Sequence, residues 1–99
     1  MSYTLIYTKR FEKDVTACRK AGRDLESLWA VVDILSEEGK LPEEYMPHML
    51  TEEYAGLWEC HIEDDWLLLW QQDDKRLTLL LTNTGTHEEL FHPIKGKKK

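Results

Sequence analysis

A chain of 99 residues holds enough material for one hydrophobic core, which excludes two independent domains. Hydrophobic residues make up 41% of the chain and charged residues 32%, a balance that excludes disorder. The net charge is −6, although four lysines crowd positions 95–99. We therefore expect one domain over residues 1–94 and a mobile lysine-rich tail over 95–99. Residues 1–94 alone carry −10, which on charge alone argues against a nucleic-acid partner.

The cysteines and the hydropathy of the chain indicate where in the cell the protein is located. Cys18 and Cys60 are the only cysteines, too few for a disulfide scaffold and without the spacing of a zinc site, so we expect both to be reduced and buried. No apolar leader precedes the domain, and the longest apolar run, residues 66–70, is far too short to cross a membrane. The sequence therefore predicts a cytoplasmic protein with no membrane contact and no cofactor.

The first half of the chain predicts a strand and two helices. Residues 3–7 are aromatic and β-branched, as in a strand, and Thr8 can cap the helix that follows. Apolar residues then recur at intervals of four and three, which predicts an amphipathic helix that ends at a left-handed cap on Gly22. Asp24 can cap a second helix, which Gly39 ends. Helices joined by so short a turn form an antiparallel hairpin.

The second half predicts three antiparallel strands after a polar loop. Residues 57–62 alternate, with apolar side chains on one face and polar ones, including His61, on the other. Residues 66–71 and 77–82 complete a meander. Residues 86–91 begin with capping-box spacing and predict a short final helix. This order predicts an α+β fold in which an N-terminal strand and a helical hairpin pack on a small antiparallel sheet.

Three polar residues in the second half could carry chemistry. Alternation places His61 on the face away from the helices, and His87 follows the last strand, where a short loop can aim it across that face. RNA is cut without metal when a base takes the 2′-OH proton and an acid protonates the departing 5′-oxygen. Histidine suits either role because its ordinary pKa is about 6.5. Asp65 can serve as the base or hold an imidazole in one tautomer. The same three residues could instead form a two-His, one-carboxylate metal site, and an isolated histidine is most often simply solvated.

Two segments resemble the signature segments of the YafQ branch of the RelE/ParE toxins. They are residues 60–70 (CHIEDDWLLLW) and 82–91 (TNTGTHEELF), and the likeness extends over nearly the whole chain. The resemblance implies a RelE-like fold, a ribosome-associated endoribonuclease that cuts mRNA without metal, and a silencing antitoxin, with a heterotetramer as one allowed assembly. It also implies an acid-base cluster of His48, His61, Asp65 and His87, and substrate contacts by Trp66 and Phe91. For those two aromatic residues, core packing is the alternative.

Two positions depart from the family pattern. Asn83 stands where an arginine usually precedes the Thr-Gly-[Ser/Thr]-His segment, so a hydrogen-bond donor replaces a charge at the phosphate. Asp64 replaces a proline and adds negative charge there. Lys75 and Arg76, on the turn before the last strand, would compensate if they reached the same face. These departures favour a second function, an antitoxin-binding module of the same fold with weak or lost cleavage. A third function, a metal-dependent hydrolase, is favoured only because histidine and aspartate are common metal ligands.

Overall fold

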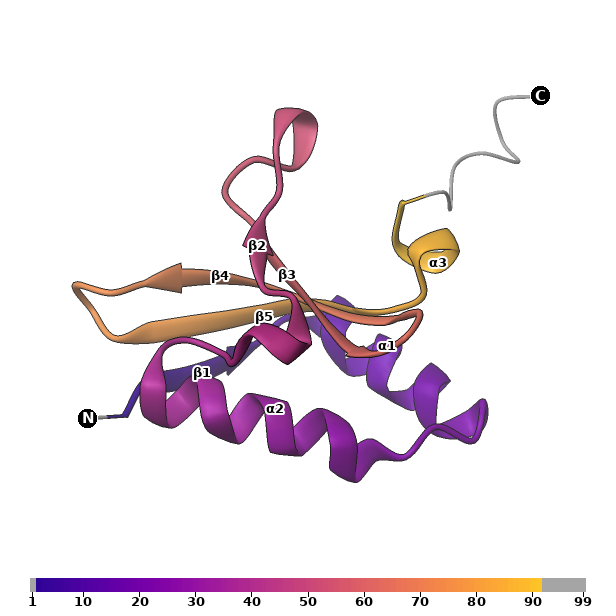
Figure 1. Ribbon diagram of the computed structural model, residues 1–99. Helices are drawn as coiled ribbons and strands as arrows, with labels where there is room; N and C mark the ends of the chain where they lie inside the picture. The colour runs from indigo at the N-terminus through magenta and orange to yellow at the C-terminus, as the bar shows by residue number, and fades with distance from the viewer. Residues whose placement is uncertain (1, 92–99) are drawn as a thin grey trace.

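Five strands form one sheet, and two long helices cover one of its faces (Figure 1). The computed structural model describes residues 2–91, so the expected tail at 95–99 lies outside the described part. The strands are β1 (Thr4–Tyr7), β2 (His48–Met49), β3 (Trp58–Glu63), β4 (Trp66–Asp73) and β5 (Thr78–Gly85). The helices are α1 (Lys9–Lys20), α2 (Leu25–Glu38) and the short α3 (His87–Phe91). The α+β prediction is confirmed, and no helix within residues 2–91 has the length and apolar character of a membrane span.

The helix boundaries follow from the residues that were predicted to cap them. Thr8 Oγ1 accepts a hydrogen bond from the backbone N–H of Phe11 at 2.9 Å, which fixes the start of α1. Asp24 Oδ1 accepts from the N–H of Glu26 at 3.1 Å and starts α2 in the same way. Gly39 ends α2 with φ 72°, a left-handed conformation that glycine adopts without steric cost.

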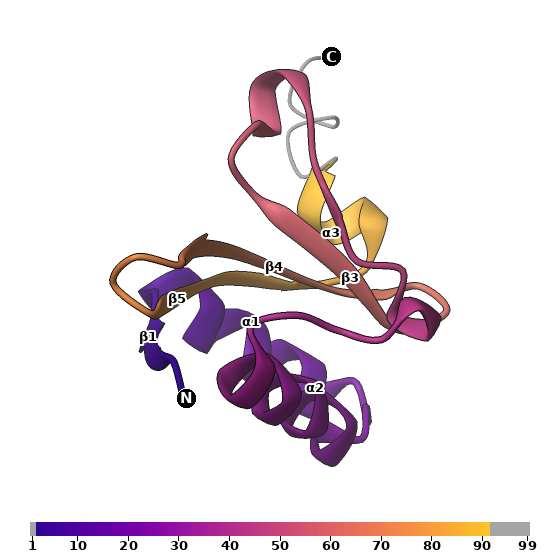
Figure 2. The same cartoon turned by 60° about the vertical axis from the view of Figure 1, so that its left-hand side comes forward.

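The core lies between the two long helices and the sheet face that they cover (Figure 2). It forms because α1 and α2 each bury an apolar stripe, while alternate residues of β3, β4 and β5 point toward those stripes. Its members include Phe11, Cys18, Leu28, Leu35, Cys60, Leu68, Trp70 and Leu81. Each fully buried large apolar side chain contributes roughly 1.5–3 kcal/mol. We call the other face of the sheet, turned away from α1 and α2, the site face.

The N-terminal strand joins the sheet beside the C-terminal one. β1 pairs in parallel with β5 and ends where Tyr7 faces Leu81, so the rest of β5 has a free edge. At this edge α1 supplies the hydrogen-bond partner: Asp14 Oδ2 accepts a hydrogen bond from the backbone N–H of Thr84 at 3.1 Å. A carboxylate thus satisfies a buried N–H that would otherwise have no partner. The part of β5 that follows Leu81, the partner of Tyr7, is therefore held in position by α1.

The predicted polar loop between α2 and β3 contains short elements that the sequence did not indicate. Two 3-10 turns, Glu43–Tyr45 and Glu52–Tyr54, flank β2, which pairs antiparallel with β3. A two-residue strand cannot show alternation, so periodicity could not have found it. The consequence is that His48 sits on a strand at the edge of the sheet, with His48 opposite Glu59.

Candidate active site

Strand register brings polar side chains from three strands onto the site face. His48 is paired with Glu59, and Glu59 is paired through a leucine of β4 with Asn83. In the neighbouring row His61 is paired in the same way with Gly85, the last residue of β5. Directly paired residues point to the same face. A register shift in β5 between the partners of Leu69 and Trp70 turns Asn83 onto this face.

His87 is held by the start of α3 and by the turn before β4. The predicted capping box is confirmed: Thr86 N–H donates to Glu89 Oε1 at 2.9 Å, and Glu89 N–H donates to Thr86 Oγ1 at 3.1 Å. Asp65 Oδ1 accepts from the backbone N–H of His87 at 3.1 Å and lies 2.8 Å from its Nδ1. These two hydrogen bonds, the backbone one first, lower the pKa of Asp65 below its usual value. An ionised Asp65 therefore fixes the imidazole and leaves Nε2 free.

His61 and His87 face each other across the site face. Their ring centroids are 5.7 Å apart with an interplanar angle of 58°. His61 Nδ1 donates to the carbonyl oxygen of Asp64 at 3.1 Å, so its Nε2 is also free. A base and an acid on either side of one phosphate each need to come within about 3 Å of the proton that they move. The separation of the two rings fits that requirement.

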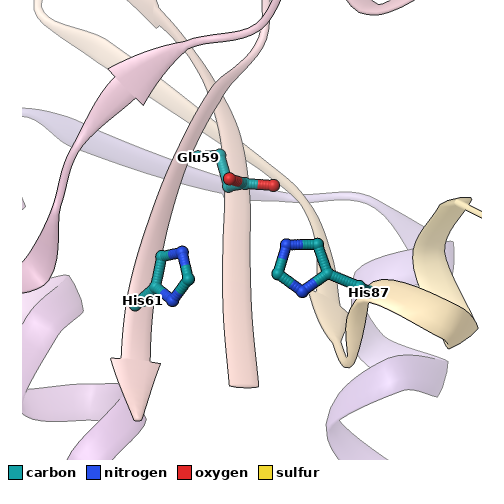
Figure 3. Close-up of side chains that lie close together, drawn as sticks. All are labelled: Glu59, His61 and His87. Atoms are coloured by element: carbon teal, nitrogen blue, oxygen red, sulfur yellow. The ribbon is translucent and has the colours of Figure 1, made fainter. Parts of the chain in front are cut away.

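Glu59 completes the cluster although the sequence analysis did not select it. One ligand atom each from Glu59, His61 and His87 lie within 4.8 Å of one another, and Figure 3 shows the carboxylate and both rings gathered in one place. Glu59 is only 4% exposed. Its Oε1 lies 3.0 Å from His48 Nε2, while His48 Nδ1 donates to the Met46 carbonyl at 2.9 Å. His48 thus reaches the cluster through Glu59.

The metal-ligand set that the sequence suggested is corrected by the geometry. That set combined His61, Asp65 and His87, but the Asp65 carboxylate bonds Nδ1 of His87. Among residues 2–91 the group with metal-ligand geometry is Glu59, His61 and His87. Two imidazoles and one carboxylate suit a transition-metal ion such as Zn²⁺ or Cu²⁺. The spacing of Glu59 and His61 along β3, two residues apart on one face, is the signal that could have indicated this.

The expected substrate contact of Trp66 is also corrected. Its side chain is 1% exposed, and its Nε1–H donates to Thr84 Oγ1 at 2.9 Å. The Arg23 guanidinium lies over the ring at 5.7 Å from its centroid. A side chain enclosed in this way belongs to the core and has no surface on which RNA could lie, so core packing was the correct alternative.

Lys75 and Arg76 lie far from the histidines. Their backbone N–H groups donate to Asp73 Oδ1 at 3.1 Å, which fixes them in the turn between β4 and β5. His87 follows the opposite end of β5, eight residues along. At about 3.3 Å per residue the two ends are roughly 25 Å apart. Figure 1 shows the turn at one end of the hairpin and α3 at the other, so the expectation that these cations compensate for Asn83 is wrong.

Asn83 and Phe91 lie at the border of the cluster. Asn83 shares the site face, but its Nδ2 is 3.4 Å from Asp14 Oδ2 at the sheet edge. Phe91 packs edge-on against Tyr54, with centroids 4.9 Å apart, and lies 6.0 Å from the His87 ring. Phe91 is only partly buried.

Comparisons with known proteins show similarity over most of the chain. The family described as "Bacterial toxin of type II toxin-antitoxin system, YafQ" matches residues 3–92. The chain is 34% identical over 86 residues to the mRNA interferase toxin YafQ of Escherichia coli (strain B / BL21-DE3), covering 86% of this chain and 91% of that protein. Its fold matches a chain in the crystal structure of the E. coli DinJ-YafQ toxin-antitoxin complex with TM-score 0.82, 29% identity and coverage of 92% and 99%. A metal-bound toxin from Helicobacter pylori matches with TM-score 0.81, 37% identity and coverage of 92% and 100%.

Fold and site together define a small toxin domain of the RelE-like α+β class. Within that class, the chain belongs to the YafQ family of bacterial toxins of type II toxin-antitoxin systems.

Proposed function

We propose that the protein is an endoribonuclease toxin that cuts mRNA on the ribosome, in the cytoplasm, and that a cognate antitoxin silences it. Its relative in E. coli is named an mRNA interferase toxin, and E. coli YafQ forms a complex with DinJ. The observation that carries the proposal is the opposed pair His61 and His87, 5.7 Å apart between ring centroids. Two imidazoles opposed in this way can act on both sides of one substrate group, one as base and one as acid.

The proposed reaction needs one base and one acid. His61 Nε2, or the Glu59 carboxylate beside it, takes the proton of the 2′-OH, and the resulting 2′-oxygen attacks the adjacent phosphorus. The bond to the 5′-oxygen breaks as His87 Nε2 delivers a proton to that oxygen. The products are a 2′,3′-cyclic phosphate and a 5′-hydroxyl. Asp65 stabilises the protonated His87 and keeps its ring in position, because it accepts from both the backbone and Nδ1 of that residue.

Stacking can place the substrate. The partly exposed ring of Phe91 beside His87 is suited to a base next to the scissile phosphate, an interaction worth about 1–3 kcal/mol. His48 acts on Glu59 rather than on RNA in this scheme, since its Nε2 is 3.0 Å from the Glu59 carboxylate. Its role is to orient that carboxylate.

The direct test is cleavage of mRNA by purified protein in EDTA, with and without ribosomes. We expect cleavage that persists in the chelator and leaves cyclic-phosphate or 3′-phosphate ends. His61→Ala is the disabled variant, and Arg76→Ala, in the distant turn, is the control that should cut normally. Activity that disappears in EDTA, or that survives in His61→Ala, would contradict the acid-base scheme.

A second candidate is an antitoxin-binding module that keeps the fold but cuts RNA weakly. Asn83 favours it, because the site face lacks the arginine that would stabilise the charge on the phosphate. Asn83→Arg separates the two candidates. If the native chain is inactive with ribosomes and causes no growth arrest when induced, and Asn83→Arg restores neither, the binding module is correct.

A metal ion bound at the same cluster would inhibit cleavage by the acid-base scheme. Glu59, His61 and His87 have the spacing of metal ligands, and a related toxin from H. pylori has been crystallised with metal bound. A bound ion would occupy the free nitrogens that the acid-base scheme requires. We therefore expect Zn²⁺ or Cu²⁺ to slow cleavage and EDTA to reverse the effect, whereas a metal-dependent hydrolase would respond in the opposite direction.

A further inference from the structure

Charge is distributed unevenly over the described residues. Residues 9–23 carry six basic side chains and two acidic ones, a net charge of +4. Residues 24–91 carry three basic and seventeen acidic side chains, a net charge of −14. Residues 2–8 carry none. The positive charge of the described domain is therefore concentrated on α1 and the turn that follows it, while the remaining surface repels a polyanion.

The lysines of α1 form one stripe that points into solvent. Lys9, Lys13 and Lys20 are all exposed and lie four and seven residues apart. With 3.6 residues per turn, these spacings place the three side chains within about 40° of one another around the helix. The opposite side of α1 carries Phe11 and Cys18, which are 1% and 3% exposed in the core. The stripe thus faces directly away from the sheet.

Two arginines lie between the lysine stripe and α3, and each is paired with an acidic side chain. Arg10 Nε is 2.9 Å from Asp14 Oδ1, and Arg23 is 4.0 Å from Glu89 Oε1. Together with Glu88 these residues line a hollow of about 410 Å³. α3 begins at His87, so the hollow adjoins the element that carries the proposed acid. The Nε of Arg23 is buried, and no group within residues 2–91 accepts its hydrogen bond. Because Asp14, Glu88 and Glu89 line the hollow beside the two arginines, the exposed lysines carry the positive charge of α1 that is available to an anion.

We propose that the basic face of α1, made of Lys9, Lys13 and Lys20, binds the phosphodiester backbone of RNA. The proposal rests on the proposed function and deepens it, because α1 also contacts β5 at Thr84, three residues before His87. An acidic protein needs such a surface, since neutralised phosphates supply most of the affinity for a nucleic acid. An acidic protein partner would be drawn to the same face, and the measurements below separate it from RNA.

The test uses the full chain in a His87→Ala background, so that binding is measured without cleavage. The docking variant is Lys13→Glu/Lys20→Glu, and the matched control is Lys75→Glu/Arg76→Glu, which changes the charge equally at the far end of the β4–β5 hairpin. Lys13 and Lys20 contact no other residue through an ion pair among those found within residues 2–91, and the one ion pair of the control, Arg76 with Asp73 at 3.9 Å, is exposed. Both variants should therefore fold, which thermal unfolding checks.

Affinity for a short unstructured RNA and for ribosomes is measured as a function of salt. We expect the docking variant to bind on the order of ten- to a hundredfold more weakly, with a slope of log affinity against log salt reduced by about 1.4, the loss of two phosphate contacts to a single strand. The control should bind nearly as the parent does. A defect on the short RNA as well as on ribosomes identifies mRNA as the ligand, and a defect on ribosomes alone identifies ribosomal RNA.

Other outcomes overturn the proposal. They are equal affinity in the docking variant and the parent, an equal loss in the control, or intact RNA binding with loss of antitoxin binding, which would assign the face to the protein partner. With His87 restored, the docking variant should raise KM and leave kcat unchanged. A parent chain that binds RNA through α1 but never cuts it would reject the proposed function and leave this inference standing.

Discussion

The two faces of the sheet differ in the side chains that they present. On the face under α1 and α2, β3, β4 and β5 present apolar side chains that are almost fully buried, such as Leu68 and Leu81 at 0% exposed. On the site face β3 and β5 present Glu59, His61 and Asn83, while β4 contributes the buried Leu67 and Leu69. Because successive side chains of a strand alternate, one sequence supplies both faces at once. The contrast teaches that apolar truncations under the helices should mainly lower stability, whereas changes to the exposed polar groups of the site should mainly lower cleavage.

The strongest test of this separation is His87→Ala. Removing the proposed acid should lower the cleavage rate by about two to four orders of magnitude, the usual contribution of general acid catalysis. The free energy of unfolding should change little, since His87 is exposed. Single-turnover cleavage and urea unfolding measure the two quantities. A variant that unfolds readily but cuts normally once folded would reverse the assignment of the site face.

Leu28→Ala tests the helix-covered face. Leu28 is 0% exposed on α2, so its truncation should lower the free energy of unfolding by about 2–5 kcal/mol. Folded molecules should still cut at the parental rate. The matched control is Ile6→Ala, which removes an apolar side chain that is 46% exposed and should cost much less. Denaturant unfolding gives both values, and similar costs for the two variants would break the comparison.

Asp65→Asn should have a smaller effect, because it disturbs the orientation of His87 and removes no proton-transfer group. We expect cleavage to fall by about 10²-fold or less, as for a misplaced catalytic group. The lowered pKa of Asp65 also gives a pH dependence. Its ionised form is favoured in the folded state, so its stabilising effect is present above the ordinary pKa of 3.8 and is lost as the pH falls through the lowered pKa.

Thermal unfolding from pH 7 to pH 3 checks the sign of that effect. The parent and Asp65→Asn should differ in Tm at neutral pH and converge only at the acid end. A difference that closes between pH 5 and 7 would mean that a histidine, and not Asp65, controls it.

The smallest effect concerns the cysteines of the core face. Burial raises the pKa of the Cys60 thiol to about 12 and also raises that of Cys18. Neither thiol should therefore react with an alkylating reagent at pH 8 while the protein is folded, and both should react in urea. Mass spectrometry of the alkylated protein measures this. Rapid labelling of the folded chain would show that the core face opens.

Much of the fold was predictable because its signals are local. Thr8, Asp24 and Gly39 cap helices through hydrogen bonds or a left-handed φ that depend on a few adjacent residues. Alternation correctly placed His61 on the side of the sheet away from the helices. The expected convergence of His61, Asp65 and His87 was also confirmed by their contacts. The family resemblance supplied His48, which no local pattern indicated.

The errors arose where long-range pairing decides the outcome. Glu59 was overlooked because its position beside both histidines depends on β3, β4 and α3 together. Trp66 was left with two alternatives, since a single sequence does not show what encloses a side chain. Lys75 and Arg76 could have been placed correctly from chain order alone: a hairpin turn and the segment after its second strand lie at opposite ends of that strand.

The parallel pairing of β1 with β5 has a consequence for synthesis of the toxin. Its register joins Thr4 to Thr78, so the first strand has no neighbour in the sheet until nearly the whole polypeptide has been made. Asp14 likewise lacks its partner, the backbone N–H of Thr84, until that residue has been added to the chain. Helices can form on an emerging chain, but the sheet that positions His61 and His87 is completed only when β5 has been made. A chain that stops before Thr78 would lack the pairing of β1 with β5, the contact of Asp14 with Thr84, and His87 itself.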